Sequence, residues 1–205
     1  MIFYHSYLSP YARRVLIAFE EKGMNPKREK HTYAREFDGL KEINPCLLLP
    51  VLVDGDMTLW GSNLILEYLI SKYPNTPPLS RSPFATSMTR QEHHWQDSRI
   101  LATIETLTDS IMNLRQMKMS GVEYDQVVYL TRQRTRIDAI LDWLDAQATA
   151  EGFAPGIFSI MDLNLVCALG NIDNRKSFEW RGRPTLEAIY GYYAERPSVK
   201  ITANE

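Results

Sequence analysis

The pattern of strand and helix signals changes once along the chain, close to Pro74. Before that point short apolar strand signals alternate with helical ones, and after it the apolar residues recur at helical spacing. The segment that follows, NTPPLSRSPFATS, is rich in proline, serine and threonine and is typical of a linker. We therefore predict an α/β domain over residues 1–76, a linker over 77–87 and an all-helical domain over 88–205.

Within the first domain, the helix signals are flanked by residues that begin or end helices. Ser9 can cap a helix that begins at Pro10, and Gly23 can end it. A second cap is expected at Ser62, before the apolar run NLILEYLI. The last two strands flank Gly55-Asp56, which suits a hairpin turn. The expected strands are residues 2–5, 27–33, 51–54 and 57–60, and the expected helices are residues 10–22, 35–44 and 63–73.

Composition excludes several classes of partner. Of the 205 residues 44% are hydrophobic and 23% are charged, and the formal net charge is −2. These values are typical of a soluble globular protein with a sizeable core, and they leave no broad basic surface for nucleic acid or an anionic membrane. The longest apolar run, LLLPVLV, is far shorter than the roughly 20 residues of a transmembrane helix. We expect neither nucleic acid nor a membrane as a partner.

The cysteines and histidines form no metal or disulfide pattern. Cys46 and Cys167 are too few for a disulfide framework, and the first residues, MIFYH, lack the basic flank and apolar core of a signal peptide. A cytoplasmic location is therefore expected. His93 and Asp97 lie four residues apart on one helical face, but two ligands do not make a site, so we expect no metal.

The helical domain contains one strong capping signal. In FSIMDL, Ser159 stands at a cap, and Asp162 follows three residues later. The carboxylate of this aspartate can reach back to the cap amide, as in a capping box. We assign both residues a structural role. Long helices are expected over about residues 84–117 and 123–150, and a last helix over residues 184–197.

Four motifs, in this order, resemble the soluble glutathione transferase family over almost the whole chain. They are YLSPYARRV, INPCLLLPVLVDGD, GSNLILEYLISKYP and FSIMDLNLVCALGNIDNR. The first matches the pattern S-P-[FY]-x-R-[KR]-V of bacterial members. The resemblance implies an α/β thioredoxin-like N-terminal domain followed by an all-α C-terminal domain, the glutathione-transferase fold. It also implies glutathione as co-substrate, no metal, and a homodimer.

The same resemblance implies a glutathione site around Pro50, whose peptide bond would be cis as in other thioredoxin-like domains. The backbone N–H and C=O of Val51 would pair with the cysteinyl backbone of glutathione. The helix that begins at Ser62 would hold the γ-glutamyl carboxylate at its N-terminus, although this serine could also be only a helix cap. The residues assigned to the site are Leu49, Pro50, Val51, Gly61, Ser62 and Asn63.

Ser9 is our first choice for the group that acts on the glutathione thiol. Only the thiolate is a good nucleophile, and a cysteinyl thiol has an unperturbed pKa of about 8.5. The Ser9 hydroxyl can donate to sulfur, and the helix N-terminus adds positive potential. Tyr7 is the alternative, because other branches of the family use a tyrosine near the first strand. Simple helix capping is the other interpretation of Ser9.

A second-substrate pocket is implied beside the long helix that follows the linker. Its expected lining residues are Tyr11, Trp95, Ser98 and Arg99, although packing or solvation explains the last three equally well. The implied reaction is attack of the glutathione thiolate on a small electrophile. Conjugation, isomerisation, dehalogenation and peroxide reduction share such a site, and the sequence does not distinguish them.

Two departures from the family pattern favour an alternative function. Relatives commonly have lysine or glutamine where this chain has Leu48, and glutamate where it has Gly61. Each lost hydrogen bond to a charged group removes about 1.5–3 kcal/mol unless Asn63, Arg13 or His5 replaces it. The alternative is a non-catalytic protein of the same fold, with a more apolar site, that acts as a binding or interaction module.

Overall fold

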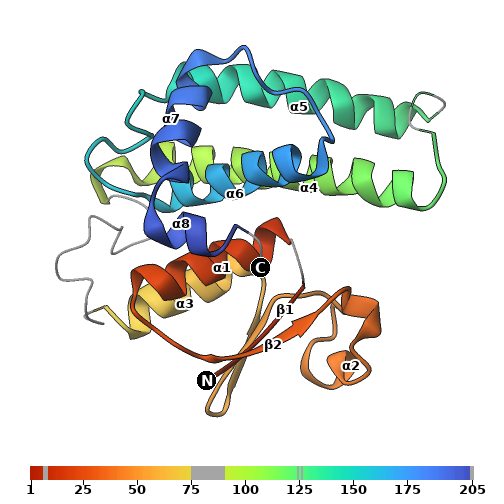
Figure 1. Cartoon of the computed structure of the whole chain (residues 1–205), viewed down its shortest axis with the longest axis vertical. Coiled ribbons are helices and arrows are strands. Elements are labelled where there is room, and N and C mark those ends of the chain that lie inside the picture. Colours follow the sequence, from red (N-terminus) through yellow and green to blue (C-terminus); the bar gives the residue numbers. More distant parts are fainter. Residues whose placement is uncertain (7–8, 75–90, 124, 126, 204–205) are drawn as a thin grey trace. The chain divides into compact units, whose positions relative to one another are not determined.

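The computed structural model describes residues 1–6, 9–74, 91–123, 125 and 127–203 (Figure 1). The chain divides into two compact units, one of residues 1–88 with 196–205 and the other of residues 89–195. The first contains the α/β elements and the second is helical, which agrees with the predicted order of the domains. The predicted linker over residues 77–87 lies outside the described residues.

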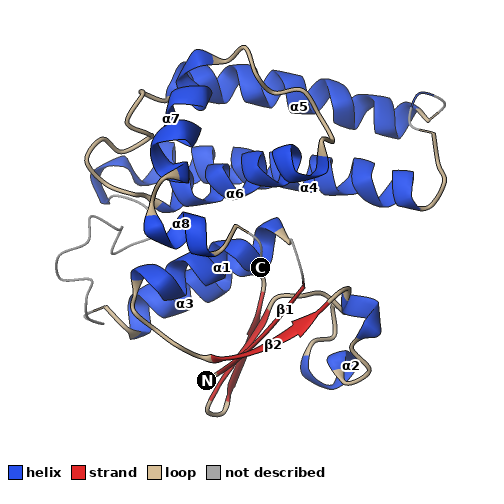
Figure 2. Ribbon diagram, viewed as in Figure 1, coloured by secondary structure: helices blue, strands red, loops and turns tan. Residues whose placement is uncertain are grey.

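The first unit is built on one mixed four-stranded sheet (Figure 2). Its strands are β1 (Ile2–Ser6), β2 (Lys27–His31), β3 (Val51–Asp54) and β4 (Met57–Trp60). They lie in the order β2-β1-β3-β4, with β1 and β2 parallel and the other two pairs antiparallel. All four strands were predicted, and β3 has a neighbour on each side.

Two helices pack side by side in this unit, α1 (Pro10–Glu21) and α3 (Ser62–Lys72) (Figure 1). The predicted helix over residues 35–44 is instead two short elements, η1 (Ala34–Glu36) and α2 (Leu40–Ile43). Apolar side chains from the sheet and both long helices are fully buried, so they form one core. They include Phe3, Phe19, Leu52, Ile65 and Leu69.

Asp54 ties the β3–β4 hairpin to the C-terminal end of α3. Its carboxylate accepts hydrogen bonds from Tyr68 at 2.8 Å, Lys72 at 3.0 Å and Tyr73. Burial by itself would raise the pKa of Asp54, but these hydrogen bonds outweigh burial and hold the pKa at about 2. The carboxylate is therefore ionised at neutral pH, and it fixes the hairpin to α3.

The last helix, α8 (Pro197–Ile201), packs against α1 in the first unit. The Arg196 guanidinium forms a two-pronged ion pair with the Glu21 carboxylate, with N–O distances of 2.5 and 2.7 Å. Ser198 donates a hydrogen bond to the same carboxylate. The C-terminal segment is therefore joined to α1 by charge as well as by packing.

This segment changes the boundary that we predicted for the helical domain. Residues 196–203 belong to the first unit, whereas we placed them in a domain over 88–205. We expected the last helix to end at Pro197, but this proline instead occupies the first turn of α8. Proline is compatible with either position, because its fixed φ suits a helix start and its missing N–H prevents continuation of a preceding helix.

The second unit consists of helices packed around α6. Every residue from Ile160 to Ile172 is buried, so this helix is enclosed on all sides. None of the helices in the described ranges is both long and apolar enough to cross a lipid bilayer. The helices of this unit are η3 (Gln91–His93), α4 (His94–Met119), α5 (Val128–Gln147), α6 (Ile160–Arg175) and α7 (Pro184–Ala194).

The predicted capping box is present at the start of α6. Ser159 accepts a hydrogen bond from the Asp162 N–H, and the Asp162 carboxylate accepts one from the Ser159 N–H at 3.1 Å. The same carboxylate also accepts from the Phe153 N–H at 2.9 Å. Gly152 has φ +111°, and a Cβ there would lie 2.5 Å from a carboxylate oxygen of Asp162. The box therefore holds the preceding loop as well as the helix.

We predict that Glu21→Gln destabilises the first unit by about 3 kcal/mol. Glu21 is only 8% exposed, so the substitution removes a largely buried charge that accepts two hydrogen bonds from the Arg196 guanidinium. Urea unfolding followed by circular dichroism measures the change. The control is Lys27→Gln, which removes the exposed ion pair with Glu29 and should have little effect. Equal losses in the two variants would contradict the assigned role.

Candidate functional site

The sheet brings three separate chain segments to one edge. Val51, the first residue of β3, is paired with Tyr4 on β1 and with Trp60 on β4. Because both neighbours run antiparallel to β3, the ends of β1 and β4 lie at the same edge as the start of β3. Ser9, which is hydrogen-bonded to the last residue of β1, therefore meets the Leu49-Pro50 segment and the start of α3 there.

Ser9 occupies the N-cap position of α1, as predicted. Its Oγ accepts a hydrogen bond from the Ala12 N–H at 3.3 Å, and its own N–H donates to the Ser6 backbone oxygen at 3.3 Å. Among the described residues, its hydroxyl donates no hydrogen bond. A hydroxyl that accepts a hydrogen bond at a cap can still donate one. Ser9 can therefore donate a hydrogen bond to an anion at the sheet edge. Tyr7, the alternative, lies outside the described residues.

The Leu49-Pro50 peptide bond is cis. The backbone of Val51, however, does not point outward as we predicted, because this residue lies between paired strands on both sides. In antiparallel sheets, the N–H and C=O of a residue point to the same neighbouring strand, so those of Val51 are directed at β1 or β4. In the described part of the chain, the Leu49 backbone forms no hydrogen bond, so Leu49 is the residue able to pair with an added strand.

Asn44 holds the loop that leads to this position. It is fully buried, and its Nδ2 donates to the Leu48 backbone oxygen at 2.7 Å while its Oδ1 accepts from the Cys46 N–H at 2.9 Å. We did not predict this role. From the sequence we interpreted Asn44-Pro45 only as the end of a helix. An asparagine side chain that forms a hydrogen bond with the backbone two residues further on is, however, a known turn signal.

The structure corrects our prediction for Ser62. This serine is the first residue of α3 rather than its cap, and the cap position is occupied by Gly61 at φ +85°. A positive φ favours glycine, which explains the residue found there. The Ser62 Oγ is buried and accepts a hydrogen bond from Arg14 at 3.3 Å. Ser62 therefore positions the helix start through Arg14, a residue to which we assigned no role.

Arg14 is fully buried in α1, and its guanidinium lies 5.1 Å from the centre of the Tyr11 ring. A cation in this position contributes positive potential near the start of α3. Both Arg13 and Arg14 belong to the motif YLSPYARRV, but nothing in the motif shows which of the two arginines is buried. Arg13, its neighbour, instead donates to the Val199 backbone at 3.0 Å and so joins α1 to α8.

The start of α3 has groups that can bind a carboxylate and a neighbouring ammonium. The first backbone bond of this helix is donated by Ile65 to Gly61, which leaves the N–H groups of Ser62, Asn63 and Leu64 outside the helical ladder. Such groups and the helix dipole favour an anion. The Asn63 side-chain oxygen is buried and accepts no hydrogen bond among the described residues. An acceptor of this kind suits an ammonium beside the bound carboxylate.

The residues predicted for a second-substrate pocket belong to different units. Tyr11 is half-buried in α1 of the first unit, and the other three lie on α4 of the second. Trp95 is 80% exposed, and the Arg99 guanidinium lies 5.4 Å from the centre of the Trp143 ring. Ser98 is half-buried. A pocket shared by these residues stays a prediction.

No metal centre is found in the described part of the chain, where no group of three or more His, Cys, Asp or Glu side chains could hold an ion. Asp97, which we paired with His93 as possible ligands, is fully buried in α4. His93 is half-exposed in η3, and its Nε2 lies 3.6 Å from the Glu92 carboxylate.

Two family models match the chain. The model of the glutathione S-transferase N-terminal domain matches residues 3–77, and the model of the C-terminal domain matches residues 128–195. Together they cover more than two thirds of the chain. The match to the first model includes the sheet edge described above, with Ser9, Leu49 and the start of α3.

Curated relatives include stringent starvation protein A homologs and glutathione S-transferases. A stringent starvation protein A homolog from Haemophilus influenzae is 31% identical over 113 residues, which are 53% of each chain. Glutathione S-transferase GstB from Escherichia coli is 27% identical over 201 residues, which are 92% of this chain and 90% of the relative. The match to the first curated relatives therefore spans about half of their length.

Solved structures share the fold over the full length. A glutathione transferase family member from Pseudomonas fluorescens Pf-5, with bound glutathione, has a TM-score of 0.82 at 26% identity and covers 98% of this chain and 97% of its own. A glutathione S-transferase from Methylobacillus flagellatus, also with glutathione bound, has a TM-score of 0.79 at 23% identity, with 100% and 99% covered. The predicted fold class, a thioredoxin-like domain followed by an all-α domain, is confirmed.

We predict that His5, on β1, makes the stability of the first unit depend on pH. Burial, followed by the charges of Lys30 and Arg28, lowers the pKa of His5 to about 4. The unfolded chain binds this proton near pH 6.5 and the folded chain only near pH 4. The free energy of unfolding should therefore fall by roughly 3 kcal/mol as the pH decreases through this window.

Urea unfolding between pH 4 and 7 measures this dependence. His5→Gln removes the titrating group and should flatten the slope between pH 4 and 6.5. His94→Gln, which replaces an exposed histidine on α4, is the control and should leave the slope as it was. A slope that persists in His5→Gln would show that another group causes it.

Proposed function

Because this chain belongs to the glutathione S-transferase family, we propose that it binds glutathione at the shared sheet edge and directs its thiolate at a small electrophile. The observation that carries the proposal is the meeting of three segments at one edge. They are the Ser9 cap, the unpaired backbone of Leu49 beside a cis proline, and the free N–H groups at the start of α3. Each suits a different part of the tripeptide.

The binding step uses the backbone more than side chains. The cysteinyl N–H and C=O of glutathione pair with Leu49 in the manner of an added strand, a role that we first gave to Val51. The γ-glutamyl carboxylate accepts hydrogen bonds from the N–H groups at the start of α3. Arg14, which donates a hydrogen bond to Ser62, adds positive potential there. The Asn63 oxygen accepts from the γ-glutamyl ammonium.

The catalytic step uses Ser9. Glutathione supplies the sulfur nucleophile, and the Ser9 hydroxyl donates a hydrogen bond that favours the thiolate over the thiol. The N-terminus of α1 acts in the same direction, because it carries positive potential. The thiol proton passes to water. The sulfur then forms a bond to the electrophilic atom, and either a leaving group departs with the bonding electrons or the resulting anion takes a proton from water. Tyr7 remains the alternative donor.

We extend the proposal to the finer family properties. The motif SPYARRV supports a place among bacterial members with the pattern S-P-[FY]-x-R-[KR]-V, and a role in detoxification in the cytoplasm. Exposed Met57 and Leu64 support a homodimer, because an apolar surface at β4 and α3 is suited to burial against a second copy. Tyr11, Trp95, Ser98 and Arg99 remain our choice for the electrophile pocket.

One observation favours a non-catalytic alternative. Leu48 is 64% exposed directly before the cis-proline segment, at the position where relatives commonly have lysine or glutamine. An exposed leucine suits an apolar ligand or a protein surface. The similarity over half of the chain to proteins named stringent starvation protein A homologs is compatible with this alternative.

Calorimetric titration with reduced glutathione decides between the two functions. We expect binding in the micromolar to low-millimolar range, and about tenfold weaker binding by Asn63→Ala, because a hydrogen bond to a charged group contributes about 1.5–3 kcal/mol. Asn174→Ala, which changes an exposed asparagine on α6, is the control and should bind normally. If the unchanged chain produces no heat and no shift in melting temperature, the enzymatic proposal is wrong and the alternative is favoured.

The role of Ser9 is tested by the pH dependence of glutathione addition to 1-chloro-2,4-dinitrobenzene. In Ser9→Ala the apparent pKa of the bound thiol should rise by about one unit, since the thiolate loses a hydrogen bond worth roughly 1.4 kcal/mol. Both Ser9→Ala and Ser159→Ala lose a helix cap, but only the first should move the profile. Ser9→Thr keeps cap and hydroxyl and should restore it. An unmoved profile in Ser9→Ala would exclude this serine.

A further inference from the structure

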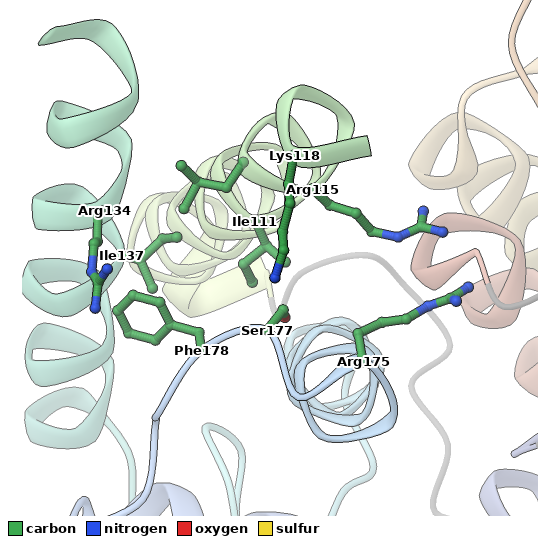
Figure 3. Close-up of a pocket in the computed structure, with 9 residues that line it drawn as sticks. Ile111, Arg115, Lys118, Arg134, Ile137, Arg175, Ser177 and Phe178 are labelled. Atoms are coloured by element: carbon green, nitrogen blue, oxygen red, sulfur yellow. The ribbon is translucent and has the colours of Figure 1, made fainter. Parts of the chain in front are cut away.

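A cavity of about 280 Å³ lies within the second unit (Figure 3). Three helices contribute to it: the C-terminal part of α4, the N-terminal half of α5, and the end of α6 with the residues that follow. Its lining residues are Ile111, Leu114, Arg115, Lys118, Arg134, Ile137, Arg175, Ser177 and Phe178.

The charged residues of this lining are all basic. Arg115 and Lys118 come from α4, Arg134 from α5 and Arg175 from α6, and the described lining contains no carboxylate. In Figure 3 the Lys118 side chain points toward Ser177, and those of Arg115 and Arg175 extend on the same side from two different helices. In the described ranges, neither Lys118 nor Arg175 forms an ion pair. Basic side chains from three helices therefore line the cavity, and among the labelled ones Lys118 points inward while Arg115 and Arg175 extend away from Phe178.

The rest of the lining is apolar. Ile111 and Ile137 are buried, and Phe178 closes one side beside Arg134, whose guanidinium lies 5.9 Å from the centre of the ring. The buried Nε of Arg175 has no hydrogen-bond partner among the described residues. Such a donor is costly to leave unsatisfied.

Helix ends explain only part of this arrangement. Lys118 and Arg175 lie in the last turns of α4 and α6, where a basic side chain offsets the negative end of the helix dipole. Arg134 lies in the second turn of α5, beyond the first turn in which the helix dipole acts, so the dipole does not explain its position. The concavity and its apolar walls are also unrelated to the dipoles.

We propose that this cavity binds a small organic anion that carries a phosphate or carboxylate group on an apolar body. The acidic group would lie beside Lys118 and Ser177, and the Arg175 side chain would turn toward it to donate two parallel hydrogen bonds. The apolar body would contact Ile111, Ile137 and Phe178. The volume admits a molecule of one or two rings rather than a protein segment.

Calorimetry with 1-naphthyl phosphate as the probe tests the proposal. We expect a dissociation constant below about 100 μM, and at least tenfold weaker binding of inorganic phosphate, which lacks the apolar body, and of 1-naphthol, which lacks the charge. 1-Naphthoic acid distinguishes a site for carboxylates from one for phosphates. If naphthyl phosphate does not bind, or binds no better than inorganic phosphate, the proposal is wrong.

Two variants locate the site. Lys118→Gln with Arg175→Gln should weaken naphthyl phosphate binding at least tenfold and leave glutathione binding unchanged. Ser177→Phe fills the cavity and should also block the probe without removing a charge. The matched control, Arg132→Gln with Lys41→Gln, removes two exposed cations elsewhere.

An equal loss of affinity in the control would show that the probe responds only to net charge and would overturn the proposal. The same applies if Ser177→Phe binds as tightly as the unchanged chain, because the probe must then lie elsewhere. Binding of an acidic peptide in preference to naphthyl phosphate would identify a protein surface instead, and would also contradict the small-molecule site.

Discussion

The site depends on the position of β3 between two antiparallel neighbours. The pairing of Val51 with Tyr4 and Trp60 decides which loops meet at one edge of the sheet. Val51 and Leu52 point to opposite faces of the sheet and are both fully buried, so β3 is packed on its two faces as well as paired on its two sides. The geometry of the site is therefore a consequence of how one short strand is packed.

Buried polar groups then refine what the sheet assembles. Arg14 reaches across from α1 to Ser62 at the start of α3, and Asn44 holds the loop before the cis proline. In both cases a fully buried side chain determines the position of backbone groups. Backbone N–H and C=O groups can recognise a peptide whatever side chains surround them, so such a site does not depend on the polar side chains that relatives have in place of Leu48 and Gly61.

The sequence predicted much of this architecture because its signals are local. The strands, the cap at Ser9 and the capping box at Ser159 each follow from a few neighbouring residues. The errors concern properties that depend on the rest of the fold. The cap of α3 lies at Gly61 because of its positive φ, and the free backbone is that of Leu49 because sheet partners occupy Val51. Neither property can be inferred from a motif.

The return of the C-terminal segment to the first unit has a consequence for synthesis. Glu21 is translated among the first residues, but Arg196 and Ser198, which bind its carboxylate, are among the last. The helical unit lies between them in the sequence, so all of its residues leave the ribosome before the α/β unit can be completed. A nascent chain released early would contain the whole sheet and still lack the groups that satisfy a nearly buried charge.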